Sequence, residues 1–157
     1  MKRPGILRLI LSIAICQLAG VFGSVFTFSA IPSWYAALNK PWFTPPNWLF
    51  GPVWISLYTL MGIALYLAWQ KGLAKNRIAL GIFAAQLALN ALWSFLFFGL
   101  RSPLLGLAGI IPLWIFIAFN IWAFWKIDKQ AGYLLVPYIV WVSIATALNY
   151  YVWILNP

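Results

Sequence analysis

The side chains with functional potential in this sequence are tryptophans, tyrosines and amides that recur at helical spacing on three apolar segments. The three stripes are Trp54, Tyr58, Met61 and Leu65; Gln86, Asn90, Trp93 and Phe97; and Tyr138, Trp141, Ala145 and Asn149. Residues three, four and seven apart share one face of a helix. Such faces are suited to binding a flat apolar molecule, with the amides as polar anchors.

Groups for proton transfer and metal binding are almost missing. The chain has no His and no Glu, a single carboxylate side chain at Asp128 and a single cysteine at Cys16. General acid–base and metal-assisted mechanisms therefore lack their usual residues. We predict no metal site, no disulfide and no required cofactor.

The elements that must position the three stripes are long apolar runs. The sequence is 65% hydrophobic, and a helix needs about 20 apolar residues to cross a bilayer. Five runs of this length fall at about 9–31, 48–70, 77–99, 104–125 and 132–155. They predict an all-α integral membrane protein, a bundle of five transmembrane helices in a single domain over 1–157. No internal repeat suggests a two-fold transporter.

The positive charges predict the orientation of this bundle. The net charge is +9, but the basic residues are scattered at the ends of the runs, which argues against nucleic acid as a partner. Lys40 and Arg101 lie on one side. The others lie before the first run or between runs on the opposite side: Lys2, Arg3, Arg8, Lys71, Lys75, Arg77, Lys126 and Lys129. The positive-inside rule then places the N-terminus in the cytoplasm and the C-terminus outside. A cleaved signal peptide is the alternative for the first run, but that run is long and lacks a small-residue cleavage site.

The amides of the stripes should face the interior of the bundle, because an unpaired amide is costly in lipid. Two interpretations stay open. In the first, the amides and tryptophans only hold the helices together, and in the second, they line a pocket in the outer half of the membrane. The spread of deep tryptophans over three helices at overlapping depth favours the pocket.

The opposite face of the 77–99 run carries small residues, Gly81, Ala84, Ala85 and Ala88. Small residues at this spacing let two helix backbones approach closely. Because the amide face already points inward, we expect this face to form a homodimer. Packing against another helix of the same chain is the alternative.

The connection at 32–47, PSWYAALNKPWFTPPN, holds four prolines and four aromatic residues. Proline fixes the backbone and removes hydrogen-bond donors, so the segment should be stiff. We expect it to cover the outer end of the bundle as a lid-like loop. An anchor at the membrane interface is the alternative.

Four segments together give the chain a resemblance to a known family. They are WYAALNKPWFTPP (34–46), GPVWISLY (51–58), QLALNALWSFLFFG (86–99) and VPYIVWVSIATALNYYVW (136–153). With the layout of five spans, they resemble the tryptophan-rich sensory protein / translocator protein family (TspO/MBR) over nearly the whole chain. The resemblance implies a bundle of five helices, often dimeric, in a bacterial-type cell membrane or an organelle membrane.

The resemblance also implies a function, that of a membrane receptor or sensor for porphyrins such as protoporphyrin IX and haem and for other flat hydrophobic ligands, which it could move within or across the membrane. The family's ligand-binding residues correspond here to Tyr35, Pro45, Trp54, Tyr58, Asn90, Trp93, Trp141 and Ala145. The alternative is an enzyme that degrades porphyrin with light and oxygen, for which the family implies the pair Trp54 and Trp141. Coupled transport is disfavoured, because the spans lack buried charges.

One departure concerns sterols. Animal members carry a cholesterol-recognition pattern at the end of the last span, with a basic residue after a tyrosine. Here no Lys or Arg follows Tyr150 or Tyr151, and Ile154 stands where the basic residue would fall. The pattern is weak even when complete, so the sequence does not predict strong sterol binding.

Overall fold

The computed structural model describes residues 3–157, with side chains from Gly5 onward, and this part of the chain contains helices and turns but no strand. The elements are α1 (Arg3–Ala30), the π turn η1 (Ile31–Tyr35), α2 (Asn47–Gln70), the 3₁₀ turn η2 (Leu73–Lys75), α3 (Arg77–Ser94), the π turn η3 (Phe95–Gly99), α4 (Pro103–Ile127), α5 (Lys129–Leu134) and α6 (Val136–Leu155). The turns η1 and η3 extend α1 and α3 without a break, and α5 leads directly into α6.

Five of these helical segments are long and apolar enough to cross a membrane: Gly5–Tyr35, Asn47–Gln70, Arg77–Gly99, Pro103–Ile127 and Lys129–Leu155. The predicted all-α fold with five membrane-spanning helices is therefore confirmed. The observed bounds extend the first and last predicted spans by several residues, because helices run past the apolar runs into polar flanks.

The predicted loop 32–47 is too long at its N-terminal end. Helical structure continues through η1 as far as Ala37, which leaves 38–46 as the connection. Pro32 lies in the first turn of η1, where the backbone widens into a π turn. A π turn accommodates the missing N–H of proline locally, so the helix does not end there.

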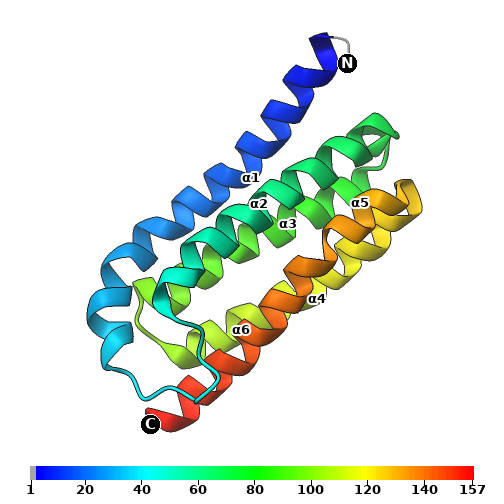
Figure 1. Cartoon of the computed structure of the whole chain (residues 1–157). Coiled ribbons are helices and arrows are strands. Elements are labelled where there is room, and N and C mark those ends of the chain that lie inside the picture. The colour runs from blue at the N-terminus through cyan, green and yellow to red at the C-terminus, as the bar shows by residue number, and fades with distance from the viewer. Residues whose placement is uncertain (1–2) are drawn as a thin grey trace.

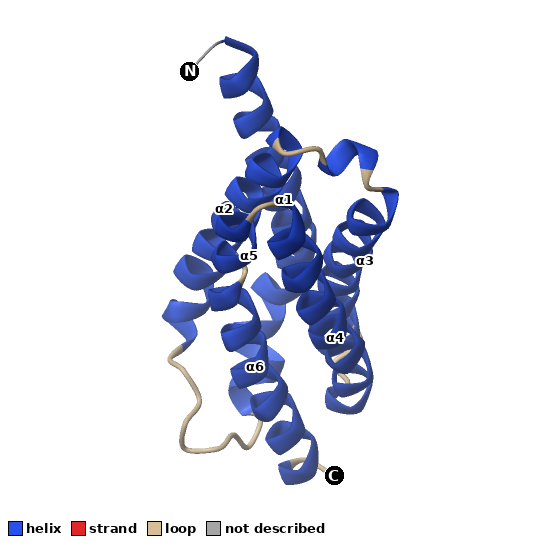
Figure 2. Ribbon diagram, turned by 90° about the vertical axis from the view of Figure 1, so that its right-hand side faces the viewer, coloured by secondary structure: helices blue, strands red, loops and turns tan. Residues whose placement is uncertain are grey.

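The five spans form a closed ring. Neighbours around the ring are α1 and α2, α2 and α5, the α5–α6 segment and α4, α4 and α3, and α3 and α1. Figure 2 shows the same bundle from the side, with the long tan connection at the end where the C-terminus lies. We call this the loop end and the other the opposite end.

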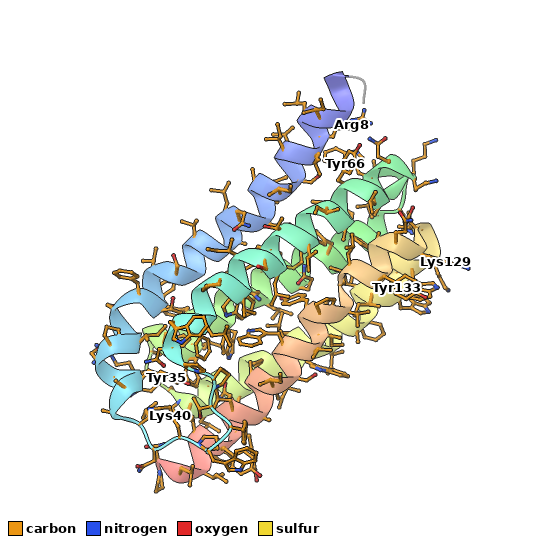
Figure 3. The ribbon with its side chains drawn as sticks, in the orientation of Figure 1. Arg8, Tyr35, Lys40, Tyr66, Lys129 and Tyr133 are labelled. Carbon is orange, nitrogen blue, oxygen red and sulfur yellow. The ribbon has the colours of Figure 1, made fainter. Side chains whose placement is uncertain are left out.

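Charged side chains lie at both ends of the bundle. Figure 3 shows Arg8 and Lys129 at the opposite end and Lys40 at the loop end. Lys126 lies 3.8 Å above the ring of Trp122, a cation–π contact near the opposite end of α4. The side chains of Lys2 and Arg3 lie outside the described residues. The cytoplasmic assignment of the N-terminus remains a prediction from this asymmetry.

Side-chain caps fix where three helices begin. Asn76 accepts a hydrogen bond from the backbone N–H of Ala79 at the start of α3, and Ser102 accepts one from Leu105 at the start of α4. The carboxylate of Asp128 accepts from the N–H groups of Gln130 and Ala131 at the start of α5. The single acidic side chain therefore has a structural role as an N-cap.

Candidate ligand-binding site

The three predicted faces meet inside the loop-end half of the bundle through a chain of hydrogen bonds. The hydroxyl of Tyr58 on α2 donates to Oδ1 of Asn90 on α3, and Nδ2 of Asn90 donates to the hydroxyl of Tyr138 on α6 at 2.7 Å. All three side chains are buried. One amide thus joins three helices and satisfies both of its ends, as a polar group in hydrocarbon requires.

A second amide link lies nearer the loop end. The indole Nε1 of Trp93 donates to Oδ1 of Asn149 at 3.2 Å, and Nδ2 of Asn149 donates to the backbone carbonyl of Pro103 at 2.6 Å. This link ties α3 and α6 to the first residue of α4. It also fixes the orientation of the Trp93 ring.

Trp54 completes an aromatic wall on α2 and α3. Its ring stacks on Tyr58 with 5.5 Å between centroids and lies 6.2 Å from the ring of Trp93. Trp93 in turn stacks on Phe97 at 5.8 Å. Offset ring pairs at these distances contribute about 0.5–1.5 kcal/mol each beyond their burial, so the rings hold one another in place.

This wall faces a cavity of about 360 Å³ between α1, α2 and the end of α3. The lining residues are Gln17, Gly20, Val21, Gly23, Ser24, Thr27, Phe28, Ile31, Phe50, Gly51, Trp54, Ile55, Tyr58, Trp93, Ser94 and Phe98. The volume lies within the range of about 300–1,000 Å³ that is usual for small-molecule sites. The cavity is mostly apolar, with amide and hydroxyl groups on the α1 side.

Two glycines of α1 let residues that line the cavity pack against this helix. A Cβ at Gly23 would lie 3.0 Å from the hydroxyl oxygen of Ser94, and a Cβ at Gly20 would overlap the ring of Tyr58. Glycine at both positions therefore lets side chains of α2 and α3 lie directly against the α1 backbone. Sequence reasoning missed the whole α1 wall. The signal was present in Gln17, Gly20, Ser24 and Thr27, small and polar residues at helical spacing in an otherwise apolar run.

The predicted binding residues divide into two groups. Trp54, Tyr58 and Trp93 line the cavity. Tyr35, Pro45, Asn90, Trp141 and Ala145 do not: Asn90 lies behind Tyr58 in the hydrogen-bond chain, Ala145 is buried on α6, and Pro45 is half-buried in the loop. The faces of α2, α3 and α6 are thus in contact with one another, and the open space lies on the other side of Trp54 and Tyr58.

Phe50 lies in contact with both the cavity and the rings of Tyr35 and Trp141. Its ring lines the cavity and packs edge-on against Tyr35 at 6.2 Å and Trp141 at 5.9 Å. The hydroxyl of Tyr35 and the indole Nε1 of Trp141 are buried without a hydrogen-bond partner. Phe50 therefore contacts both the cavity and the two residues that carry these unsatisfied donors.

Hydrogen bonds fasten the 38–46 connection to the end of η1 and to Asn156, just after α6. Nζ of Lys40 donates to the carbonyls of Tyr35, Ala36 and Leu38. Asn39 and Asn156 exchange hydrogen bonds, from the Asn39 N–H to Oδ1 at 3.0 Å and from Nδ2 of Asn156 to the Asn39 carbonyl at 2.9 Å. Burial lowers the pKa of Lys40 below its ordinary value.

The predicted dimer face is open in the structure of one chain. Gly81, Ala84 and Ala88 are exposed and Ala85 is half-buried, and a Cβ at Gly81 would meet no atom within 4 Å. Among residues 3–157, no group of three His, Cys, Asp or Glu side chains could hold a metal ion. The chemistry that the site offers is ring stacking, apolar contact and hydrogen bonding.

Comparison with known proteins gives consistent matches over almost the entire length. The profile of the TspO/MBR family matches residues 12–154. Tryptophan-rich protein TspO of Archaeoglobus fulgidus is 47% identical over 151 residues, which cover 96% of this chain and 98% of that protein. Tryptophan-rich protein TspO of Chlorobaculum tepidum is 47% identical over 154 residues, covering 97% and 98%. Translocator protein of Bos taurus is 37% identical over 140 residues, covering 87% and 83%.

Proposed function

The chain belongs to the TspO/MBR family, and from this premise we propose that it is a membrane receptor or sensor that binds porphyrins and other flat hydrophobic molecules. Its relatives are named as tryptophan-rich sensory proteins and translocator proteins, and it is itself an integral multi-pass membrane protein. A bacterial-type cell membrane is compatible with the bacterial relatives. Transfer of the bound ligand within or across the membrane forms part of the same proposal.

The observation that carries the proposal is the stacked wall of Trp54, Tyr58 and Trp93 beside the cavity. A flat macrocycle would gain about 25 cal/mol for each Å² of apolar area that it covers on this wall. At about 360 Å³, the cavity is too small to enclose a whole tetrapyrrole. Part of the ring would therefore extend beyond the cavity, either outward or past Phe50.

Polar groups of the ligand have donors to meet beyond Phe50. The Tyr35 hydroxyl and the Trp141 indole N–H are buried and unpaired, and such groups destabilise a protein until they find an acceptor. A rotation of Phe50 would expose both donors to a ligand carboxylate or carbonyl. This geometry supports including Tyr35 and Trp141 in the binding site, although neither lines the cavity.

Porphyrin binding should depend little on the central metal. The chain has no His, the commonest axial ligand of haem iron. We therefore expect haem and metal-free protoporphyrin IX to bind with similar affinity. A strong preference for haem would contradict this part of the proposal.

The proposal is tested by titrating detergent-purified protein with protoporphyrin IX and following the porphyrin absorbance. We expect saturable binding that weakens about tenfold in Trp54→Leu, because a stacked ring and its buried area are lost. Trp122→Leu is the matched control, since Trp122 is 56% exposed on α4 outside the cavity. Equal affinity of the two variants would overturn the assignment of the cavity.

A second candidate function is breakdown of porphyrin under light and oxygen, with Trp54 and Trp141 as oxidisable neighbours. It is favoured by one observation: Trp54 lies in the cavity wall, where its ring would touch a bound pigment. Illumination of the complex should then bleach the porphyrin, and Trp54→Phe should slow the bleaching more than Trp141→Phe. Identical decay in both variants and the unsubstituted protein would exclude a catalytic role for the pair.

A homodimer through α3 also belongs to the proposal. The exposed small-residue face of Gly81, Ala84, Ala85 and Ala88 supports it, because two such faces can pack closely in lipid. Cysteines at Ala84 or Ala88 should crosslink two chains in membranes, whereas a cysteine at Val140, exposed on α6, serves as the comparison. Absence of crosslinked dimer from both small-residue positions would contradict this arrangement.

A further inference from the structure

We infer that the ligand enters the cavity laterally, from the hydrocarbon interior of the membrane, between α1 and α2. This inference rests on the proposed function. The ligands so selected are flat molecules already dissolved in the bilayer. The 38–46 loop, which the sequence suggests as a lid, serves on this view as a fixed cover over α6.

The exposure of the lining residues locates the opening. The floor is made by buried side chains, Tyr58, Trp93, Ser94 and Phe98. Every exposed lining residue belongs to α1 or α2: Val21, Ser24, Phe28, Gly51 and Ile55. The mouth of the cavity therefore lies in the seam between these two helices, on the surface that faces lipid.

The contact between α1 and α2 changes along this seam. Near the opposite end the helices touch directly, since a Cβ at Gly62 would lie 2.5 Å from Cα of Ile13. Closer to the loop, Nε2 of Gln17 joins α1 to the Ile55 carbonyl and the Thr59 hydroxyl, both at 3.0 Å. Beyond Gln17 the seam opens into the cavity. These contacts fasten the two helices to each other on the side of the mouth that faces the opposite end.

The hydroxyl groups at the mouth are compatible with contact with lipid. The Ser24 hydroxyl donates to the Val21 carbonyl at 2.7 Å, and the Thr27 hydroxyl donates to the Ser24 carbonyl at 3.2 Å. Both donors are satisfied within α1. The mouth therefore does not require water, and an apolar molecule can cross it without leaving a polar hydrogen unpaired.

The loop end gives no comparable entrance. None of the residues 38–46 lines the cavity. The loop is held by three hydrogen bonds from Lys40 and by the reciprocal bonds between Asn39 and Asn156. Moving the loop would uncover α6 without removing any residue that lines the cavity.

The inference is tested by the rate at which protoporphyrin IX quenches tryptophan fluorescence in proteoliposomes. Ser24→Phe places a ring in the mouth, whereas Val25→Phe adds the same ring at the next position, which is exposed but outside the cavity. We expect Ser24→Phe to slow both association and dissociation by about tenfold or more, with Val25→Phe unchanged. Gly51→Phe repeats the test from α2, where the added side chain has open space.

A variant with a loosened loop tests the alternative, in which the ligand enters at the loop end. The double variant Asn39→Ala, Asn156→Ala removes the reciprocal bonds and should leave both rates unchanged. Faster binding in this variant, or equal rates for Ser24→Phe and Val25→Phe, would overturn lateral entry. Failure of the proposed function is a different result, because the unsubstituted protein would then show no saturable quenching at all.

Discussion

The two halves of the bundle hold their helices together in different ways. In the opposite-end half, backbones meet directly: added Cβ atoms at Gly62 and Gly132 would lie 2.5 Å and 3.0 Å from Cα atoms of Ile13 and Trp125. In the loop-end half, rings and amides stand between the helices, as in the chain from Tyr58 through Asn90 to Tyr138.

This contrast suggests a physical basis for keeping a cavity open in a small membrane protein. Helix association in lipid depends on close packing and on polar contacts, because lipid tails are as apolar as the side chains. The opposite-end half uses close packing, with Gly62 and Gly132 lying directly against the backbones of neighbouring helices. The loop-end half uses hydrogen-bonded and stacked side chains as spacers, and the cavity forms beside them.

The largest expected effect tests the close packing. Gly62→Ala puts a methyl group against the backbone of Ile13, which cannot move aside as a flexible side chain would. We expect a loss of about 2 kcal/mol or more in unfolding free energy, typical of overpacking. The matched control is Gly51→Ala, whose Cβ meets nothing within 4 Å and which should gain up to about 1 kcal/mol from helix propensity.

These two variants are compared by denaturant unfolding in detergent, followed by circular dichroism. Equal changes in unfolding free energy for Gly62→Ala and Gly51→Ala would contradict the claim that close packing distinguishes the opposite-end half. A loss for Gly62→Ala accompanied by normal porphyrin binding at low temperature would sharpen it, because packing in one half would then be separable from the site in the other.

The next effect contrasts two buried amides on α3. Asn90→Leu leaves the hydroxyls of Tyr58 and Tyr138 without their shared partner, and we expect a loss of about 1–2 kcal/mol. Gln86 is equally buried, but its Oε1 has no partner and its Nε2 only reaches Sδ of Met61 at 3.9 Å. Gln86→Leu should therefore be neutral or stabilising.

Thermal unfolding of both variants under one set of conditions checks this pair. Equal losses would mean that the amide of Gln86 contributes as much as that of Asn90, and the hydrogen-bonded spacer would no longer distinguish the loop-end half.

Much of this architecture could be predicted from the sequence, because hydrophobic run length and helical spacing depend on local chemistry. The five spans and the facing stripes that contain Tyr58, Asn90 and Tyr138 follow from these patterns. The N-cap formed by Asp128 could be predicted for the same reason, since a carboxylate just before a helix is a local sequence signal.

The cavity could not be predicted in this way. Its α1 wall depends on the Tyr58 ring lying against Gly20, and the position of a ring between two helices is a tertiary outcome that spacing does not encode. The same holds for the loop, whose place over α6 depends on Asn39 meeting Asn156, 117 residues away. The sequence pattern singles out small residues on the outer face of α3, whereas glycines on other helices, among them Gly62 and Gly132, make close contacts within the chain.

The smallest expected effect concerns Asp128 at the opposite end. Its carboxylate caps α5 through the N–H groups of Gln130 and Ala131, so Asp128→Ala should cost about 1 kcal/mol and Asp128→Asn only a few tenths, because Asn caps a helix about as well. Both variants should bind porphyrin as the unsubstituted protein does, since the capped turn lies at the end of the bundle away from the cavity. Unfolding curves and porphyrin titrations of the two variants provide the measurement. If Asp128→Asn instead weakened binding while leaving stability intact, the charge itself would act on the ligand site, and the division between a structural half and a ligand-holding half would no longer stand.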